Sequence, residues 1–269
     1  MHRRLYLWAL AATFAFAPIT AQQAPRVAAL ALPSAPPGLS PDCRTNARDR
    51  TRPLLSMRGA VRSRSLVRVL AIGSSSTAGV GASSPSATFV SRLETSLEGS
   101  VKGWQFDVVG RGLSGEVAQG AADRMRQEVA DTKPDLIVWQ VGTNDALRHV
   151  NIDKFKICLK TTLAWLAERK IDVVLLDPQY GDALTKDGYY EVVVAATREV
   201  AREARVLLVD HFEAMRELQR GRGDGFYLAS DKLHMNDRGH RCLAEQLARA
   251  IVGGLLEADA EAEQPVFRN

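Results

Sequence analysis

Short apolar segments alternate with amphipathic segments along the chain from residue 66 to residue 256. The apolar segments are rich in β-branched residues and end at Gly, Pro or Asp, which is typical of buried strands. The segments predicted as strands are Leu66–Ile72, Phe106–Val109, Leu136–Val141, Ile171–Leu176 and Val206–Val209. Those predicted as helices are Ala87–Leu97, Glu116–Val129, Ile152–Ala167, Tyr189–Glu203, His211–Leu218 and Asn236–Leu256.

This alternation predicts an α/β fold with one domain over residues 66–256. Strands separated by helices favour right-handed βαβ crossovers and a parallel sheet. The predicted strands are continuously apolar, as expected when helices cover both faces of the sheet. We therefore expect a single three-layer, doubly wound domain with a five-stranded parallel sheet.

The N-terminus has the pattern of a signal peptide, predicted over residues 1–21. Two arginines precede a mainly apolar run of thirteen residues, Leu5–Ala17. This run is shorter than the roughly 20 residues of a membrane-spanning helix and fits the apolar region of a secretory signal, with cleavage after Ala21. An uncleaved membrane anchor is the alternative interpretation. We expect a periplasmic or secreted protein without an integral membrane span after signal removal.

The segments that flank the predicted domain lack sustained periodicity. Residues 22–65 are rich in Pro, Ala and Arg and are predicted to be a mobile linker, and residues 257–269 an acidic, frayed tail. Of the three cysteines, Cys158 and Cys242 lie in helical patterns and are expected to be small buried hydrophobes. The spacing of Cys43 leaves its pairing open.

Charge argues against a nucleic-acid partner, although the net charge is +4. Residues 1–66 hold ten Arg and two Asp, whereas residues 67–269 hold 25 Lys and Arg against 29 Asp and Glu. The predicted domain is therefore mildly acidic, without the clustered basic face that phosphates require. Cysteine and histidine spacings indicate no metal site, and no nucleotide-binding glycine motif is present.

Glycine-rich or polar segments follow the predicted strands at one edge of the sheet. They begin after strand one at Gly73, after strand two at Gly110 and after strand three at Gly142, and a fourth polar segment, 231–236, precedes the last helix. Ligands of open α/β sheets bind beyond the carboxyl ends of the strands. The convergence of these segments predicts the functional site there.

The residue types in these segments suit acyl transfer. A serine hydroxyl at Ser75 needs a base, which His234 supplies if Asp231 holds its other ring nitrogen. The tetrahedral intermediate needs hydrogen-bond donors, and the candidates are the backbone N–H groups of Ser75 and Gly115 and the side-chain amide of Asn144. A helix predicted after Ser75 would add its dipole.

Several alternatives stay open at these positions. Ser74 and Ser76 compete with Ser75 as nucleophile, and all three serines could instead cap the next helix. Gly112 is a weaker oxyanion candidate than Gly115. Within the last segment, His240 repeats the spacing of Asp231 to His234, but an N-cap at Asn236 or Asp237 would place it inside a helix.

Other polar residues at this edge have less specific patterns. Asp145 is expected to orient its loop or to cap the helix that follows. Tyr180, Tyr189 and Tyr190 are interpreted either as lining an acyl or sugar pocket or as core residues.

The order Ser75, Gly115, Asn144, Asp231 and His234 resembles the SGNH hydrolases, also called GDSL-type esterases, over residues 70–250. The resemblance implies a flavodoxin-like sheet and hydrolysis of esters without a metal or other cofactor. It implies Ser75 as nucleophile, His234 as base and Asp231 as its orienting partner. Gly115 and Asn144 would then be oxyanion donors.

The chain departs from this family's common motifs at three positions. Ser74 replaces the Asp that often precedes the nucleophile, Gly110 stands where Asn is common, and Met235 replaces Pro after the histidine. We expect an exported serine esterase for small esters, O-acetyl groups on carbohydrate among them. The alternatives are a lipase or thioesterase, and a non-catalytic or acyl-transferring relative that binds glycans.

Overall fold

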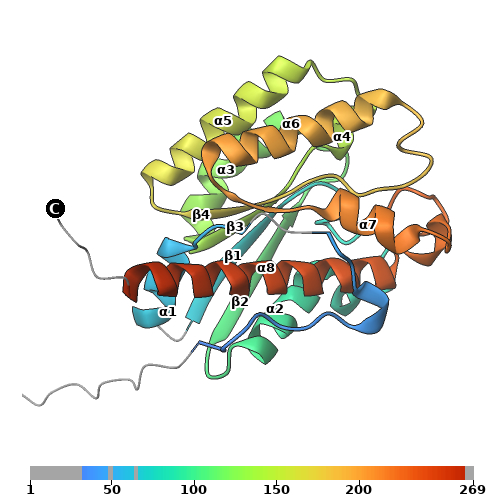
Figure 1. Ribbon diagram of the computed structural model, residues 1–269. Helices are drawn as coiled ribbons and strands as arrows, with labels where there is room; N and C mark the ends of the chain where they lie inside the picture. Colours follow the sequence, from blue (N-terminus) through green and yellow to red (C-terminus); the bar gives the residue numbers. More distant parts are fainter. Residues whose placement is uncertain (1–31, 48–50, 64–65, 264–269) are drawn as a thin grey trace, which may run out of the picture.

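The computed structural model describes residues 32–47, 51–63 and 66–263, and the predicted signal peptide lies outside these residues. Figure 1 shows a central sheet with helices on both faces. The strands are β1 (Leu66–Gly73), β2 (Gln105–Gly112), β3 (Leu136–Gln140), β4 (Asp172–Leu176) and β5 (Leu207–Val209). The α-helices are α1 (Leu55–Ser63), α2 (Phe89–Ser100), α3 (Ala118–Thr132), α4 (Thr143–Leu147), α5 (Ile152–Glu168), α6 (Gly188–Ala204), α7 (His211–Gln219) and α8 (Asp237–Glu263). Short 3-10 helices are η1 (Pro41–Cys43), η2 (Pro85–Ala87) and η3 (Asp224–Phe226).

The sheet confirms the predicted five parallel strands, in the order β2-β1-β3-β4-β5. This is the flavodoxin-like order, in which the chain reverses direction across the sheet between β1 and β3. All five strands end at the same edge because every pair is parallel. The loops that carry the predicted site residues therefore follow a common edge.

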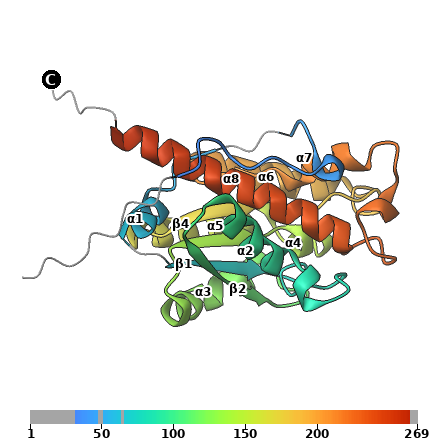
Figure 2. The same ribbon diagram turned by 90° about the horizontal axis from the view of Figure 1, so that it is seen from below.

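Alternate side chains of the strands enter two separate cores. One core packs Val69, Val138 and Val174 against α1, α2 and α8, and the other packs Leu70 and Ile137 against α3, α5 and α6. Figures 1 and 2 show α8 crossing one face of the sheet beside α1 and α2. Burial on both faces explains why the strands are continuously apolar in sequence.

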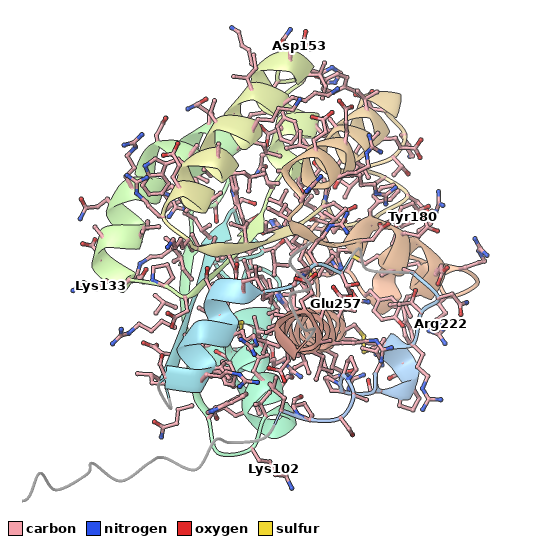
Figure 3. The ribbon with its side chains drawn as sticks, turned by 60° about the vertical axis from the view of Figure 1, so that its left-hand side comes forward. Lys102, Lys133, Asp153, Tyr180, Arg222 and Glu257 are labelled. Atoms are coloured by element: carbon pink, nitrogen blue, oxygen red, sulfur yellow. A yellow bond between two sulfur atoms is a disulfide. The ribbon has the colours of Figure 1, made fainter. Side chains whose placement is uncertain are left out.

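The prediction of a mobile linker over residues 22–65 is wrong for its described part. Residues 32–47, called here the N-terminal strap, lie against α7 and α8 (Figure 3). Its backbone N–H at Ser40 donates to Glu245, and Thr45 donates to Glu217. Residues 55–63 form α1, whose buried Met57 and Val61 join the core.

A disulfide fixes the strap to α8. It joins Cys43 and Cys242, whose Cα atoms lie 5.0 Å apart, so the expectation that Cys242 is a simple buried hydrophobe is wrong. Cys158 is free and buried, as predicted. The predicted tail also differs, because α8 continues to Glu263.

No helix among the described residues is both long enough and apolar enough to span a bilayer. The apolar run Leu5–Ala17 lies outside those residues.

The disulfide is expected to contribute substantially to stability, because it closes a loop with a sequence separation of 199 residues. Replacing both cysteines with serine should lower the free energy of unfolding by about 2–5 kcal/mol. Urea unfolding followed by circular dichroism measures this difference. Reductant should destabilise the wild type and leave the double variant unaffected; equal unfolding midpoints for both proteins would contradict the assignment.

Candidate active site

The structure brings Ser75 and His234 into contact, as predicted. Ser75 is the second residue after β1, and its Oγ lies 2.9 Å from Nε2 of His234, which is 159 residues away in sequence. On the other side of the ring, Nδ1 lies 2.6 Å from Oδ2 of Asp231. A hydroxyl, an imidazole and a carboxylate thus form one hydrogen-bonded chain.

The Asp231 carboxylate is organised by its own loop. Its Oδ1 accepts hydrogen bonds from the backbone N–H groups of Leu233 and His234, both at 3.0 Å. Partial burial raises the pKa of this carboxyl, but the hydrogen bonds from the His234 ring and from the backbone outweigh burial and lower the pKa to about 2. Asp231 is therefore ionised at neutral pH, and the ring proton of His234 must reside on Nδ1, facing it.

A tight turn, not a helix, follows the nucleophile position. Val80 N–H donates to Ser75 O and Ala78 N–H donates to Ser74 O, and α2 begins only at Phe89 with Thr88 as its N-cap. The three serines therefore do not cap α2, and the helix dipole expected beside Ser75 is absent from this turn.

Gly112 and Gly115, the two glycines considered as oxyanion donors, have different structural roles. A Cβ on Gly112 would lie 2.1 Å from the backbone nitrogen of Ala78, so Gly112 allows β2 to pack against the turn after Ser75. Gly115 has φ +80°, a conformation that favours glycine. Within the described residues, neither Ser75 N–H nor Gly115 N–H has a hydrogen-bond acceptor, which leaves both available as donors.

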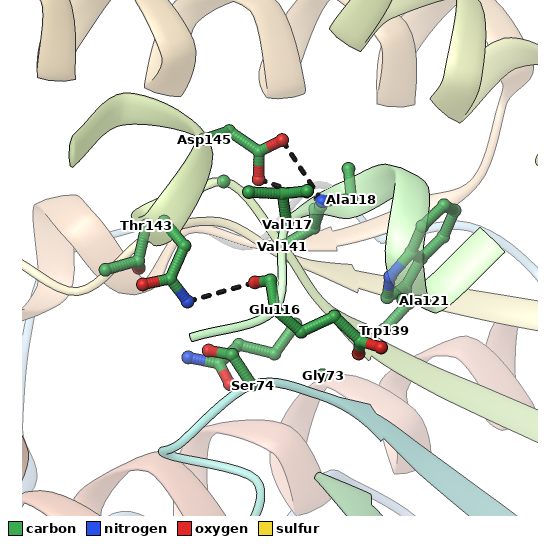
Figure 4. A pocket seen from close by; sticks show the side chains of 13 residues that line it. Gly73, Ser74, Glu116, Val117, Ala118, Ala121, Trp139, Val141, Thr143 and Asp145 are labelled. Carbon is green, nitrogen blue, oxygen red and sulfur yellow. Dashed lines mark hydrogen bonds between the residues drawn. The ribbon is translucent and has the colours of Figure 1, made fainter. Parts of the chain in front are cut away.

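Asn144 lies on α4, a five-residue helix that is separated from β3 by two residues and that was not predicted from the sequence. Its Nδ2 donates one hydrogen bond to Glu116 O at 3.0 Å (Figure 4). A side-chain amide has two N–H groups, so the second remains for a ligand. The first bond ties α4 to the loop that carries Gly115.

Two further interactions hold this loop, residues 113–117. Glu116 forms a bidentate ion pair with Arg124, whose Nη2 also donates to Arg111 O at 2.8 Å. Asp145 is buried and accepts from Ala118 N–H with both carboxylate oxygens (Figure 4). Asp145 therefore holds the start of α3. Of the two predicted roles, capping of the following helix is wrong, whereas a role in orienting the loops fits these hydrogen bonds. Burial is the largest cause that raises its pKa, to about 6, against the lowering effect of these hydrogen bonds.

Gln179 is a buried positioning residue that the sequence analysis missed. Its Oε1 accepts from Thr143 Oγ1 at 2.9 Å, and its Nε2 donates to Leu233 O at 3.1 Å. It therefore links the start of α4 to the loop of Asp231 and His234. Its position after β4, at the edge that carries the other polar segments, is the signal that could have identified it.

The residues that the sequence offered as alternatives to the proposed site residues form hydrogen bonds elsewhere. His240 is buried in α8, where its Nδ1 accepts from Phe89 N–H and its Nε2 donates to Val80 O, and Asn236 is the helix N-cap. Tyr190 is a core residue that donates to Gln179 O.

The remaining tyrosines also have defined partners. Tyr180 donates to Asp182, and Tyr189 stacks on His149. Among the described residues, no group of three or more His, Cys, Asp or Glu side chains is arranged to hold a metal ion.

The fold and this arrangement define an SGNH-type hydrolase that acts on ester bonds. A model of the non-GDSL lipase-like family matches residues 42–257, and the chain belongs to this family. An acetylxylan esterase from Geobacillus stearothermophilus is 27% identical over 161 residues, which are 54% of this chain and 71% of that protein.

Solved structures share the fold. The crystal structure of Axe2, an acetylxylan esterase from Geobacillus stearothermophilus, superposes with a TM-score of 0.60 at 22% identity, covering 69% of this chain and 94% of that one. TesA superposes with a TM-score of 0.59 at 24% identity, covering 68% of this chain and 97% of that one.

A substitution at Gln179 tests whether its hydrogen bonds to Thr143 and Leu233 position the loop of Asp231 and His234. Replacing it with methionine keeps its volume and removes both side-chain hydrogen bonds, so the His234 loop should lose its anchor. We expect kcat for p-nitrophenyl acetate to fall about tenfold with little change in KM, because geometry and not binding is disturbed.

Gln219 supplies the matched control. It is also a buried glutamine, the last residue of α7, but its Nε2 donates to Tyr180 O and makes no hydrogen bond to α4 or to the loop of Asp231 and His234. Gln219→Met should leave kcat within about twofold of the wild type. Equal effects of the two substitutions would show that Gln179 has no special influence on the site.

Proposed function

We propose that this protein hydrolyses small carboxylic esters, acetyl esters of carbohydrates in particular, through an acyl-Ser75 intermediate. The observation that carries the proposal is the chain of contacts from Ser75 Oγ to His234 Nε2 and from His234 Nδ1 to Asp231 Oδ2, at 2.9 and 2.6 Å. This chain contains every group needed to activate a hydroxyl as a nucleophile.

In the first step, Ser75 Oγ attacks the ester carbonyl carbon while His234 Nε2 takes the hydroxyl proton. The carbonyl π electrons move to oxygen, and the resulting oxyanion is bound by Ser75 N–H, Gly115 N–H and the free N–H of Asn144. The tetrahedral intermediate then collapses. The bond to the alcohol oxygen breaks, and the imidazolium gives its proton to the leaving alcohol.

In the second step, water replaces the alcohol. His234 removes a proton from water, whose oxygen attacks the acyl carbon and forms a second oxyanion at the same donors. Collapse releases the carboxylic acid and returns the proton to Ser75 Oγ. Asp231 stays ionised throughout and stabilises the imidazolium, consistent with its pKa of about 2.

The comparison with known proteins supports a short acyl group. The curated relative is named an acetylxylan esterase, which supports an acetyl ester on a polysaccharide as the substrate.

We also propose that the protein is exported to the periplasm or secreted. The apolar run Leu5–Ala17 after two arginines is typical of a secretory signal. The pairing of Cys43 with Cys242 supports the same location, because disulfides form and persist in oxidising compartments.

A panel of p-nitrophenyl esters from acetate to octanoate tests the proposed function. The wild type should have its highest kcat/KM on acetate. Ser75→Ala should lower kcat/KM by about 10⁴-fold or more, since the covalent intermediate cannot form. Ser76→Ala is the matched control and should retain most of the activity.

Two results would contradict this assignment. Comparable activity of the wild type and Ser75→Ala would show that Ser75 is not the nucleophile. A maximum of kcat/KM at octanoate would point to a lipase or thioesterase instead of an acetyl esterase.

A further inference from the structure

The guanidinium of Arg148 lies beside the proposed oxyanion donors. Arg148 follows α4 directly, one helical turn after Asn144, and its backbone N–H donates to Asn144 O at 3.0 Å. A Cβ built on Gly115 would lie 3.2 Å from Nη2 of Arg148. The side chain therefore extends from α4 to the outer side of the loop that carries Gly115.

This guanidinium is exposed and forms no hydrogen bond or ion pair with another described residue. Neighbouring carboxylates are already engaged: Glu116 by Arg124, Asp187 by His149 at 2.6 Å, and Asp231 by His234. Asp145, three residues before Arg148, is buried and directs both oxygens at Ala118 N–H. No described carboxylate pairs directly with Arg148; its attraction for the buried Asp145 is electrostatic, without a hydrogen bond, and lowers the pKa of that carboxyl. The guanidinium of Arg148 therefore keeps its hydrogen-bond donors free at the edge of the site.

A second cation lies in the loop that carries the base. Lys232 directly follows Asp231 in sequence. Its side chain is exposed and forms no ion pair with another described residue. One exposed cation therefore lies beside the loop of Gly115 and another in the loop of His234. Exposed cations at these two positions favour an anionic substrate.

Exposed apolar side chains neighbour Arg148 in sequence and across the loop. Leu147 precedes it and is 47% exposed, and Leu113, near Gly115, is 54% exposed. A sugar ring carrying a carboxylate has matching properties: C–H groups that contact leucine, and a planar anion that a guanidinium binds with two parallel hydrogen bonds.

We propose that Arg148 is a specificity-determining residue that binds a carboxylate of the alcohol part of the ester, so that the substrate class is O-acetylated acidic carbohydrate. This inference rests on the proposed function, which it narrows from carbohydrate esters in general to those that carry a uronic acid. Lys232 adds to the electrostatic attraction for the substrate carboxylate, and we assign it no hydrogen bond to the substrate.

Two esters that differ only in charge test the proposal: acetylated methyl glucuronoside, which carries a carboxylate, and acetylated methyl glucoside, which does not. The measured quantity is the ratio of kcat/KM values for acetate release, acidic over neutral. The wild type should give a ratio of about ten or more, since a charge-assisted hydrogen bond contributes at least that factor. Arg148→Gln should bring the ratio close to one, and added salt should lower the wild-type ratio.

Arg169→Gln is the control, because it removes the same charge from an exposed arginine that stacks on Trp165 at the far end of α5. It should keep the wild-type ratio. A wild-type ratio near one, or a ratio unchanged by Arg148→Gln, overturns the proposal. So does an equal loss on both esters in Arg148→Gln, which would assign Arg148 to the oxyanion or to the fold. Failure of the wild type to hydrolyse even p-nitrophenyl acetate would instead overturn the proposed function.

Discussion

Parallel pairing of the five strands is the constraint on which the site depends. Because every strand runs in the same direction, every strand ends at the same edge of the sheet, and each connecting loop can bring one chemical group to it. Ser75 comes after β1, Gly115 after β2, Asn144 after β3, and the segment with Asp231 and His234 precedes α8. The common edge therefore explains how Ser75 and His234, 159 positions apart in sequence, come within hydrogen-bond distance.

Placement at one edge does not by itself fix geometry to the tolerance that catalysis needs, and buried polar interactions supply that precision. Gln179 joins the start of α4 to the histidine loop, and the ion pair of Glu116 with Arg124 holds the Gly115 loop. Asp145 replaces the missing side-chain cap of α3 from another element. The bonds of Gln179 to Thr143 and of Asp145 to Ala118 are buried, so losing a partner there would leave an unsatisfied buried group.

The strands and most of the helices could be predicted because their patterns are local: a buried strand is apolar throughout, and an amphipathic helix repeats every 3.6 residues. Helix α1 was missed because its nine residues contain a Gly and four Ser or Arg residues within an arginine-rich segment. The five residues of α4 are too few to show a period. The extension of α8 to Glu263 was missed because an acidic, alanine-rich end has helical propensity but no apolar face of its own.

Within the site, the hydroxyl, ring and carboxylate were predictable because their chemistry is rare and their loops share an edge. Their supports were not, because they depend on side-chain directions across long sequence distances. The Gln179 bond to Leu233 O spans 54 positions, and the partner of Cys43 among the remaining cysteines is set only by the path of the strap along α8.

The central claim is that Ser75, activated by His234, is the nucleophile of this protein. Labelling with a serine-directed fluorophosphonate, followed by peptide mapping in a mass spectrometer, tests it most directly. We expect one modification, on Ser75, that disappears in Ser75→Ala and forms far more slowly in His234→Ala. Modification of Ser74, Ser76 or a distant serine in place of Ser75, or undiminished labelling of Ser75→Ala, would contradict it.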